Sequence, residues 1–455
     1  MQKPTIAIIG GGVAGLSAAV ALVDRGFAVT LFEAGSQLGG RARTVVVENN
    51  NLMHLLDNGQ HILLGAYRET ISLVKKMDIN PAGAFLRMPL TLDVRSTSYK
   101  ESLKNGNSAL NVKPIFLLQS AHYLPAPLHL LVGLLGCQGL SFKEKWSAIT
   151  LIRRLKSSHY KIAQDMVLED FLNAHKQSLR LITLLWEPLC LAALNTPLAE
   201  ASTRVFLNVL HDSFEGKKTN SDFLLPRLDL SQILSQPMAR YIQQKGATVN
   251  LSTRVLNITT QNNGFLLKTN HHDAQEFSHV IVATPANRVR DLLESIPKLT
   301  QILAYLDQYT YQPIYTVYLQ YAANITLPKP IAGLTDGLSQ WVFDRGQLCG
   351  QHGLIAVIIS AVGKHQKITQ DELALRVARE LHIAFPHLEK PLWNKVIAEK
   401  RATFTCKPDL YRPTHKTAQT NLYLAGDYTY ADYPATIEGA IRSGLACAAL
   451  IANNA

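Results

Sequence analysis

The fold class is indicated most clearly by residues 6–44, IAIIGGGVAGLSAAVALVDRGFAVTLFEAGSQLGGRART. It opens with a β-branched, apolar run typical of a buried strand and continues with helical spacing over residues 13–25. It then returns, at AVTLFE, to a second apolar strand that ends in an acid. Strand, glycine turn, helix and strand in this order predict the opening of a doubly wound α/β sheet.

Three glycines, Gly10, Gly12 and Gly15, form the pattern GxGxxG between the first strand and the helix. Gly10 permits the tight turn, Gly12 lets the backbone approach a pyrophosphate, and Gly15 allows the helix to pack closely on the strand. The phosphates then face a helix N-terminus. Glu33 ends the second strand, where a carboxylate can accept the ribose hydroxyls. The pattern therefore predicts a dinucleotide site.

The segment after Glu33 indicates which dinucleotide binds. LGGRART, residues 38–44, brings a second flexible turn and the fixed cation of Arg41 back toward the diphosphate. A plain nicotinamide site does not need this additional contact, whereas FAD is longer and stays bound through turnover. The segment therefore favours FAD.

The C-terminal stretch LYLAGDYTYADYPATIEGAIRSG, residues 422–444, supplies the flavin half of the predicted site. A strand ends at Ala425 and Gly426, and the Asp427 carboxylate follows where it can bond the ribityl chain or, alternatively, cap a turn. A helix begins near Thr436. Its N-terminal amides and dipole would point at the flavin pyrimidine edge, where reduction places negative charge.

Composition bounds the remaining possibilities. The 455 residues are 47% apolar and 17% charged, which predicts two packed domains with a large interior. The net charge of +11 comes from scattered Lys and Arg without interleaved aromatic residues, so no nucleic-acid partner is expected. The five cysteines form no CxxC pair and the N-terminus has no signal-peptide pattern, which together predict a reduced, cytoplasmic protein without a metal.

Residues 115–142 carry no Asp, Glu, Lys or Arg. Their length alone would suggest a membrane span, but Pro125 and Pro127 interrupt the middle of the segment. Two interpretations stay open: an apolar helical hairpin that dips into one leaflet, or ordinary core helices.

Strand-like segments recur near residues 250, 265 and 280 and again in the tail. They predict a discontinuous, Rossmann-like FAD-binding domain formed by residues 1–64, 221–295 and 413–455. Between its parts, the pattern predicts a helix-rich, substrate- or membrane-facing region over residues 65–220 and a mixed-sheet substrate domain over residues 296–412.

These motifs resemble those of a known group of flavoproteins. The glycine turn with Glu33, the GGRART segment and the LAGD…PATIEGAIRSG tail are similar to the flavin-containing amine oxidase and phytoene desaturase superfamily. The resemblance narrows to the hydroxysqualene dehydroxylase group, also called squalene-associated FAD-dependent desaturases, through DNGQHILLGAY (57–67), LLWEPLCLAALNTPLAEAS (184–202), LLPRLDLSQIL (224–234) and YPATIEGAIRSG (433–444). It covers essentially the whole chain.

The resemblance implies FAD contacts wherever this sequence matches the family motifs. These residues are Gly10, Gly12, Val13, Ala14, Gly15, Glu33, Ala34, Gly40, Arg41, Gly59, Gln60, Val255, Gly426, Asp427, Thr436 and Ile437. Val255 is included because the valine of the TRVLNI strand reaches the adenine side in such enzymes through its backbone. Tyr428, Tyr430 and Tyr433 stand where amine oxidases often carry an aromatic cage, and the sequence does not place their rings.

The resemblance further implies that reduced FAD delivers hydride to C1 of hydroxysqualene, an allylic alcohol, while the hydroxyl leaves as water and squalene forms. The C–O bond breaks heterolytically only if the leaving oxygen is protonated or strongly hydrogen bonded. We therefore expect one acid in a dry, elongated, apolar cavity. His61 is the first candidate, although it would equally fix its loop; Asp229 and Glu187 follow, although they would equally cap a helix or pair with an arginine.

Other interpretations stay open. The same flavin and apolar tunnel suit a carotenoid-type desaturase that moves hydride in the reverse direction. A non-catalytic prenyl-lipid carrier would have no use for intact Glu33, Arg41 and Asp427. No second glycine-rich nicotinamide turn is present, so we expect an external reductant or reductase. The basic surface and the uncharged segment predict peripheral docking on the inner, cytoplasmic face of the membrane.

Overall fold

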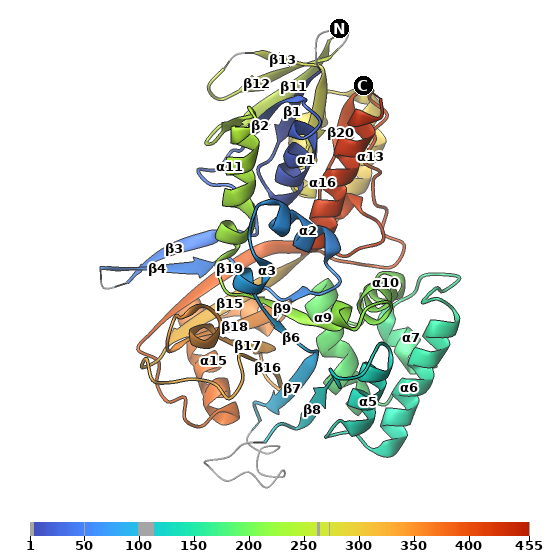
Figure 1. Cartoon of the computed structure of the whole chain (residues 1–455), viewed down its shortest axis with the longest axis vertical. Helices are drawn as coiled ribbons and strands as arrows, with labels where there is room; N and C mark the ends of the chain where they lie inside the picture. The colour runs from blue at the N-terminus through green and yellow to red at the C-terminus, as the bar shows by residue number, and fades with distance from the viewer. Residues whose placement is uncertain (1–3, 50, 99–112, 262–263, 273, 455) are drawn as a thin grey trace.

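The computed structural model describes residues 4–49, 51–98, 113–261, 264–272 and 274–454. Its nucleotide-binding half contains a parallel five-stranded sheet whose strands come from both ends and the middle of the chain (Figure 1). Across the sheet, the strands are β10 (Thr248–Asn250), β2 (Ala28–Phe32), β1 (Thr5–Ile9), β14 (His279–Val282) and β20 (Leu422–Leu424). The predicted discontinuous α/β fold is confirmed, whereas the division of the chain into the five segments given above stays a prediction.

Helices α1 (Val13–Val23) and α16 (Ile437–Ala452) lie side by side against this sheet (Figure 1). Every residue of α1 is buried, because the helix also contacts α11 (Gln236–Gln244). Gly444 of α16 permits the close contact with α1, since a Cβ at this position would lie 2.2 Å from the Ala14 carbonyl oxygen. The two ends of the chain are therefore packed as one unit.

A small antiparallel sheet lies beside the nucleotide sheet and consists of β11 (Val255–Gln261), β12 (Gly264–Thr269) and β13 (Gln275–Phe277). The ring of Phe277 meets the ring of Phe32 edge-on at 5.9 Å, which joins the two sheets.

A larger sheet forms the other half of the molecule. In order, its strands are β19 (Trp393–Phe404), β15 (Tyr311–Gln320), β18 (Leu354–Ser360), β17 (Trp341–Asp344), β16 (Ile331–Thr335), β7 (Thr91–Ser96) and β8 (Phe116–Gln119). Alternate residues of β18, such as Val357, pack with α15 (Gln370–Ala384), while Ile358 points into the opposite cluster. Period-two alternation thus lets one strand serve two cores.

Helices and short strands complete the molecule. The small sheet has the order β5 (Leu63–Leu64), β9 (Phe223–Pro226) and β6 (Phe85–Met88), and a separate hairpin consists of β3 (Thr44–Asn49) and β4 (Leu52–Asp57). The helices are α2 (Arg68–Lys76), α3 (Pro81–Ala84), α5 (Leu128–Gly136), α6 (Phe142–Ser157), α7 (Leu168–Ala174), α8 (Leu179–Leu181), α9 (Glu187–Leu194), α10 (Thr203–Phe214), α12 (Val289–Leu293), α13 (Thr300–Leu306) and α14 (Arg345–Cys349). Strands β6, β7 and β8 lie within the stretch that the Leu-rich pattern marked as helix-rich.

Residues 115–142 do not form the expected helical hairpin. Their first part is β8, which pairs antiparallel with β7, and a turn through Pro125 and Pro127 leads into the single helix α5. The alternative of ordinary core helices is also wrong for the first part, because an apolar run becomes a strand when a partner strand completes its hydrogen bonds. Within the described ranges, no helix is long and apolar enough to span a bilayer.

Candidate active site

A cavity of about 820 Å³ lies between the two halves of the molecule. It runs along the carboxyl ends of β1, β2, β14 and β20, which is where ligands bind in open parallel sheets. Each strand end contributes a pair of lining residues, namely Ile9 and Gly10, Glu33 and Ala34, Ala283 and Thr284, and Gly426 and Asp427.

The glycine turn provides the close backbone approach that a phosphate requires. Gly10 has a φ of +112°, and a Cβ there would lie 2.6 Å from the Ala283 carbonyl oxygen. A Cβ on Gly15 would lie 2.0 Å from the Gly10 carbonyl oxygen, so Gly15 serves packing and does not line the cavity. Gly12, the N-cap of α1, instead faces open space. The free amides of this helix start can therefore meet a pyrophosphate.

Glu33 is fixed at the end of β2 by two hydrogen bonds. Its Oε2 accepts from the Gly11 amide at 2.7 Å and its Oε1 from the Gly35 amide at 2.7 Å. Val255, at the start of β11, lines the same cavity. Because each carboxylate oxygen keeps a further lone pair, the oriented side chain can still accept ribose hydroxyls.

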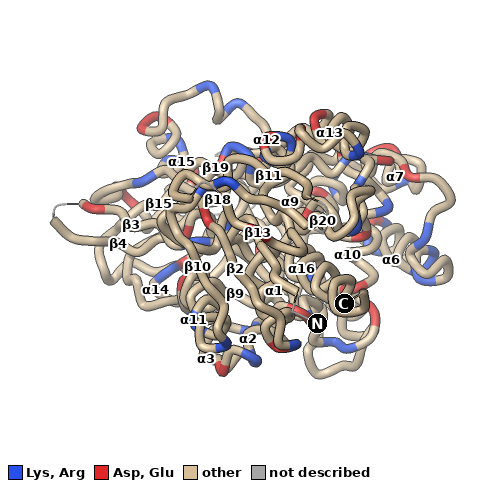
Figure 2. The backbone as a smooth tube through the Cα atoms, turned by 90° about the horizontal axis from the view of Figure 1, so that it is seen from above, with Lys and Arg blue, Asp and Glu red and all other residues tan. Residues whose placement is uncertain are grey.

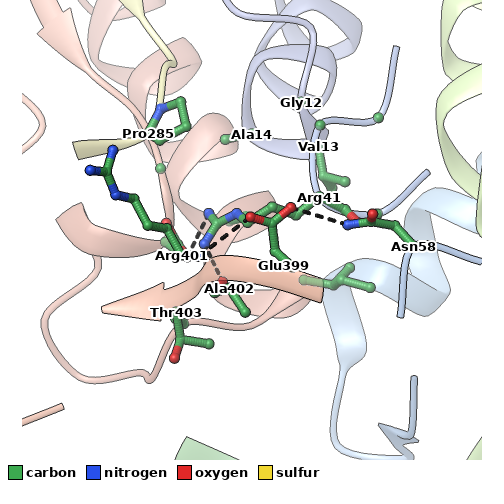
Figure 3. A pocket seen from close by; sticks show the side chains of 18 of the residues that line it. Gly12, Val13, Ala14, Arg41, Asn58, Pro285, Glu399, Arg401, Ala402 and Thr403 are labelled. Carbon is green, nitrogen blue, oxygen red and sulfur yellow. Dashed lines mark hydrogen bonds and ion pairs between the residues drawn. The ribbon is translucent and has the colours of Figure 1, made fainter. Parts of the chain in front are cut away.

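The GGRART segment and the tail meet at an ion pair. Arg41 Nη2 lies 2.8 Å from Asp427 Oδ2, and Arg41 Nη1 donates to the Ala402 carbonyl oxygen at 2.6 Å (Figure 3). Asp427 is buried, and both charged side chains line the cavity next to Gly40. A cation for a diphosphate and a carboxylate for a hydroxylated chain are thus held side by side.

The loop between β20 and α16 is held by Arg412, which no sequence motif predicted. Its guanidinium donates to the carbonyl oxygens of Asp427, Tyr428, Tyr430 and Tyr433 at 2.5–3.2 Å. The Tyr428 and Tyr433 side chains are buried, and none of the three tyrosines lines the cavity among the described residues. The tyrosines therefore shape the loop and form no cage around the cavity.

Helix α16 starts at the cavity. The Thr436 hydroxyl oxygen caps it by accepting from the Gly439 amide at 3.1 Å, and Thr436 and Ile437 both line the cavity. The remaining free amides and the positive end of the helix dipole therefore face the cavity, where they favour negative charge.

His61 lies in the cavity wall next to Gly59 and Gln60. Its Nδ1 is 2.5 Å from the Gly59 carbonyl oxygen, and because a carbonyl accepts, Nδ1 carries the proton. Burial lowers the pKa of His61, while the nearby Asp57 carboxylate opposes that shift. The ring is therefore neutral at pH 7, with its second nitrogen available.

A buried network of hydrogen bonds and an ion pair supports the loop that carries Gln60 and His61. Arg345 donates to Gln60 Oε1 at 2.6 Å and lies 3.5 Å from Asp57 Oδ2, and Asp57 also accepts from the Leu230 amide at 3.0 Å. Tyr318 donates to the Asp57 carbonyl oxygen at 2.8 Å. Burial raises the pKa of the Asp57 carboxyl, and the Arg345 cation opposes it. Asp57 thus shapes the loop, and Arg345 is a positioning residue that no sequence motif indicated.

The other two acid candidates lie outside the cavity lining of the described chain. Asp229 accepts from the Thr44 hydroxyl and, at 3.0 Å, from the Gln232 amide, so it caps the following helical turn. Glu187 lies at the start of α9, where burial raises the pKa of its carboxyl. Of the three candidates, the structure brings only His61 to the cavity.

The lining contributed by α9 and the larger sheet is mostly apolar. Its apolar residues are Leu191, Ala192, Ala193, Ile314, Trp341, Phe343, Ile358 and Ala402, and the same sheet adds the polar residues Ser360, Glu399, Arg401 and Thr403. Polar residues that the sequence reasoning missed also line the cavity, among them Asn58, Glu399 and Arg401, and Asn58 donates to Glu399 at 3.3 Å (Figure 3). Glu399 and Arg401 lie on β19 outside the recognised motifs, whereas Asn58 lies within DNGQHILLGAY beside the two predicted FAD contacts Gly59 and Gln60.

These residues fit FAD. The open space before Gly12, the fixed Glu33 carboxylate, the Arg41–Asp427 pair and the start of α16 all border a single cavity. They suit, respectively, a pyrophosphate, a ribose, a hydroxylated linker and a ring that gains negative charge. Such a fold and site define a dinucleotide-binding flavoprotein oxidoreductase.

The chain belongs to the flavin-containing amine oxidoreductase family, whose model matches residues 13–452. It is 28% identical over 457 residues to hydroxysqualene dehydroxylase of Zymomonas mobilis, covering 97% of this chain and 98% of that one. It is 24% identical to a zeta-carotene desaturase of Solanum lycopersicum, and the match covers 99% of this chain and 81% of that one. The predicted family resemblance is confirmed, and the enzyme is an FAD-dependent oxidoreductase.

Solved structures agree with the fold. A putative protoporphyrinogen oxidase from Exiguobacterium superposes with a TM-score of 0.69 at 16% identity, covering 100% of both chains. Putrescine oxidase superposes with a TM-score of 0.72 at 15% identity, covering 99% of both. At this identity, the likeness concerns the fold alone.

Proposed function

We propose that this enzyme reduces hydroxysqualene to squalene with loss of water, as part of squalene and hopanoid biosynthesis. The observation that carries the proposal is the apolar wall of α9 and the larger sheet, which continues directly from the FAD-binding part of the cavity. A long hydrocarbon fits such a wall because its burial there removes apolar surface from water. The dehydroxylase relatives support the same substrate.

The reaction requires a hydride, a proton and an exit for water. When bound and reduced, FAD supplies the hydride. The allylic C–O bond breaks heterolytically, the hydroxyl leaves with one proton as water, and the hydride forms the new C–H bond, so atoms and electrons balance. In this proposal the protein supplies the proton or hydrogen bond to the leaving oxygen and keeps bulk water from the allylic cation.

His61 is the residue best placed for the leaving oxygen. Its ring lines the cavity, and the Gly59 carbonyl fixes the ring orientation through Nδ1. Nε2 must carry a proton at the moment of transfer, which requires the imidazolium form. The aromatic rings of Trp341 and Phe343 in the same wall would stabilise positive charge on the substrate.

The proposed substrate and product reside in lipid, so we also propose that the enzyme works at the inner membrane surface. An external reductant or reductase would regenerate the reduced cofactor, since the sequence carries one glycine-rich dinucleotide turn.

The test is a single-turnover experiment without oxygen. The purified holoenzyme is reduced, mixed with detergent-dispersed hydroxysqualene, and followed by flavin absorbance while the lipids are extracted. We expect the flavin to reoxidise with one squalene formed per flavin. A flavin that stays reduced would overturn the proposal.

The zeta-carotene desaturase relatives favour a second candidate, removal of hydride from a polyene. Its test starts from the oxidised holoenzyme mixed with a carotenoid precursor under the same conditions. Reduction of the flavin with a new double bond in the lipid would assign the enzyme to desaturation.

A further inference from the structure

Helix α5 presents an unpartnered apolar stripe to the outside. Leu128, Leu131, Val132 and Leu135 are 36–46% exposed and follow the spacing i, i+3, i+4, i+7, so they share one helix face. The opposite side is buried, and a Cβ on Gly133 would lie 2.7 Å from the Gln119 carbonyl oxygen of β8. The helix is therefore clamped to the sheet by one side only.

The stripe continues onto the start of α6. Phe142 and Trp146 are 74% and 54% exposed, and their rings stack with centroids 6.4 Å apart. Lys145 Nζ donates to the Leu135 carbonyl oxygen at 2.8 Å, which ties the start of α6 to the end of α5. We call these six apolar residues, Leu128, Leu131, Val132, Leu135, Phe142 and Trp146, the α5–α6 face.

The net charge next to this face is positive. Helix α5 carries no charged residue, whereas α6 carries five Lys and Arg and one Glu, and the blue segments along α6 appear in Figure 2. The single acid, Glu144, is engaged at the helix start by the Ser141 amide and hydroxyl at 2.8 Å. Among the basic residues, Lys156 pairs with Glu215 at 3.5 Å. An apolar stripe beside excess positive charge suits an anionic bilayer.

A second exposed apolar feature provides a contrast. Leu52 and Met53, near the tip of the β3–β4 hairpin, are each 65% exposed, and the hairpin lies on the opposite side of the molecule from α6 (Figure 1). Its two strands contain Glu48 and Asp57 but no Lys or Arg. The hairpin therefore lacks the charge complementarity for an anionic surface.

An apolar pocket lies directly beneath the α5–α6 face. It has a volume of about 140 Å³ and reaches from Leu131, on the exposed stripe, to Leu189 of α9. Leu191, on the same helix, lines the FAD cavity. One helix thus separates the pocket under the face from the catalytic cavity.

We propose that the α5–α6 face docks the enzyme on an anionic lipid bilayer. The stripe and the two stacked rings enter the headgroup and acyl boundary, and the Lys and Arg of α6 lie against the lipid phosphates. The inference rests on the proposed function only in that an isoprenoid substrate resides in this bilayer, since the face itself is defined by exposure and charge.

The test measures co-flotation of the holoenzyme with vesicles. Vesicles of phosphatidylcholine with phosphatidylglycerol are compared with vesicles of phosphatidylcholine alone, at low and high salt. We expect binding to the anionic vesicles, weakened by salt, and a loss of at least about tenfold in the double variant Phe142→Ser, Trp146→Ser. The matched control, Leu52→Ser with Met53→Ser, removes equally exposed apolar side chains and should bind as the wild type does.

Absence of flotation of the wild-type enzyme, or equal flotation of the double variant, would overturn the proposal. The face would instead belong to a contact with a second copy of the chain if the wild-type enzyme forms a dimer and does not bind vesicles, and if the double variant, unlike the control variant, is a monomer. Turnover of detergent-dispersed hydroxysqualene separates this proposal from the proposed function. If docking is right, the double variant keeps that turnover and loses turnover of vesicle-embedded substrate, whereas a wrong substrate assignment leaves flotation intact.

Discussion

His61 combines a fixed orientation with a low affinity for protons. The Gly59 carbonyl holds Nδ1, and burial disfavours the imidazolium. A proton placed on this ring is therefore readily released, which suits a group that protonates a leaving hydroxyl but also limits the fraction of enzyme that carries the proton at neutral pH.

We expect His61→Gln to retain bound FAD and to lower kcat by about 100-fold or more, because glutamine can still donate a hydrogen bond but cannot transfer a proton. The measurement is the rate of squalene formation at a flavin content confirmed by absorbance. The control is His272→Gln, at an exposed position. Undiminished turnover in His61→Gln would remove the residue from the mechanism.

The pH profile tests the same assignment. If the imidazolium is the acid, kcat rises as the pH falls through the pKa of His61, which lies below the usual value of about 6.5. The free energy of unfolding responds to the same group: the unfolded chain binds the proton more readily, so stability is lost as the pH falls below about 6.5. His61→Gln should remove the pH dependence of kcat and only its own part of the stability change, because burial also lowers the pKa values of His129, His279, His365 and His415. A wild-type kcat that does not change on the acid side would contradict the assignment.

The contact between α1 and α16 couples the two halves of the cofactor site. The start of α1 faces the cavity at Gly12 and the start of α16 faces it at Thr436. Their separation is set by Gly444, where a Cβ would lie 2.2 Å from both the Ala14 carbonyl oxygen and Ser17 Oγ. No flexible side chain end absorbs the clash with the Ala14 carbonyl, so the helices must move apart.

We expect Gly444→Ala to lower the free energy of unfolding by about 1–3 kcal/mol, which is typical of overpacking, and to weaken FAD retention. The measurements are a denaturant titration and the flavin content after gel filtration. The control is Gly83→Ala in α3, where no atom lies within 4 Å of the added Cβ. Equal stability and flavin content in both variants would show that the helices do not need this close approach.

The whole molecule is organised around one cavity that five distant stretches of chain share. Residues before 70, around 191, around 255, between 283 and 361, and after 398 all contribute to its wall. Its two sheets approach each other there, and the Arg41–Asp427 pair connects the N-terminal segment with the tail. A bound cofactor would therefore contact all of these parts of the chain at once.

Removal of FAD should consequently lower the Tm of the entire chain, and readdition should restore it. A ligand at 100 times its Kd adds about 2.7 kcal/mol to the free energy of unfolding. Calorimetry of holoenzyme, stripped protein and reconstituted protein measures the effect. Asp427→Asn should show a smaller gain on reconstitution. Identical Tm values with and without FAD would contradict the role of the cavity as the link.

The nucleotide-binding turn, the acid at the end of β2 and the helix that starts at Thr436 follow from short stretches of the sequence alone. These features are local, because a positive φ, a close backbone contact or a helix start depends on a few adjacent residues. The family motifs extended the same reasoning to FAD. Gly59, Gln60 and His61, which follow the end of β4, line the cavity, and their roles toward FAD and substrate stay predictions.

Which side chains meet depends instead on the packing of elements that are distant in the sequence. Asp229 caps a helical turn while His61 reaches the cavity, and Arg345 and Arg412 act on residues far away in sequence. The same holds for residues 115–142, where β7 supplies the hydrogen bonds that make one half a strand, and sheet packing leaves one face of α5 uncovered. The physical reason is that strand pairing and side-chain partners are long-range choices, which an apolar pattern permits but does not select.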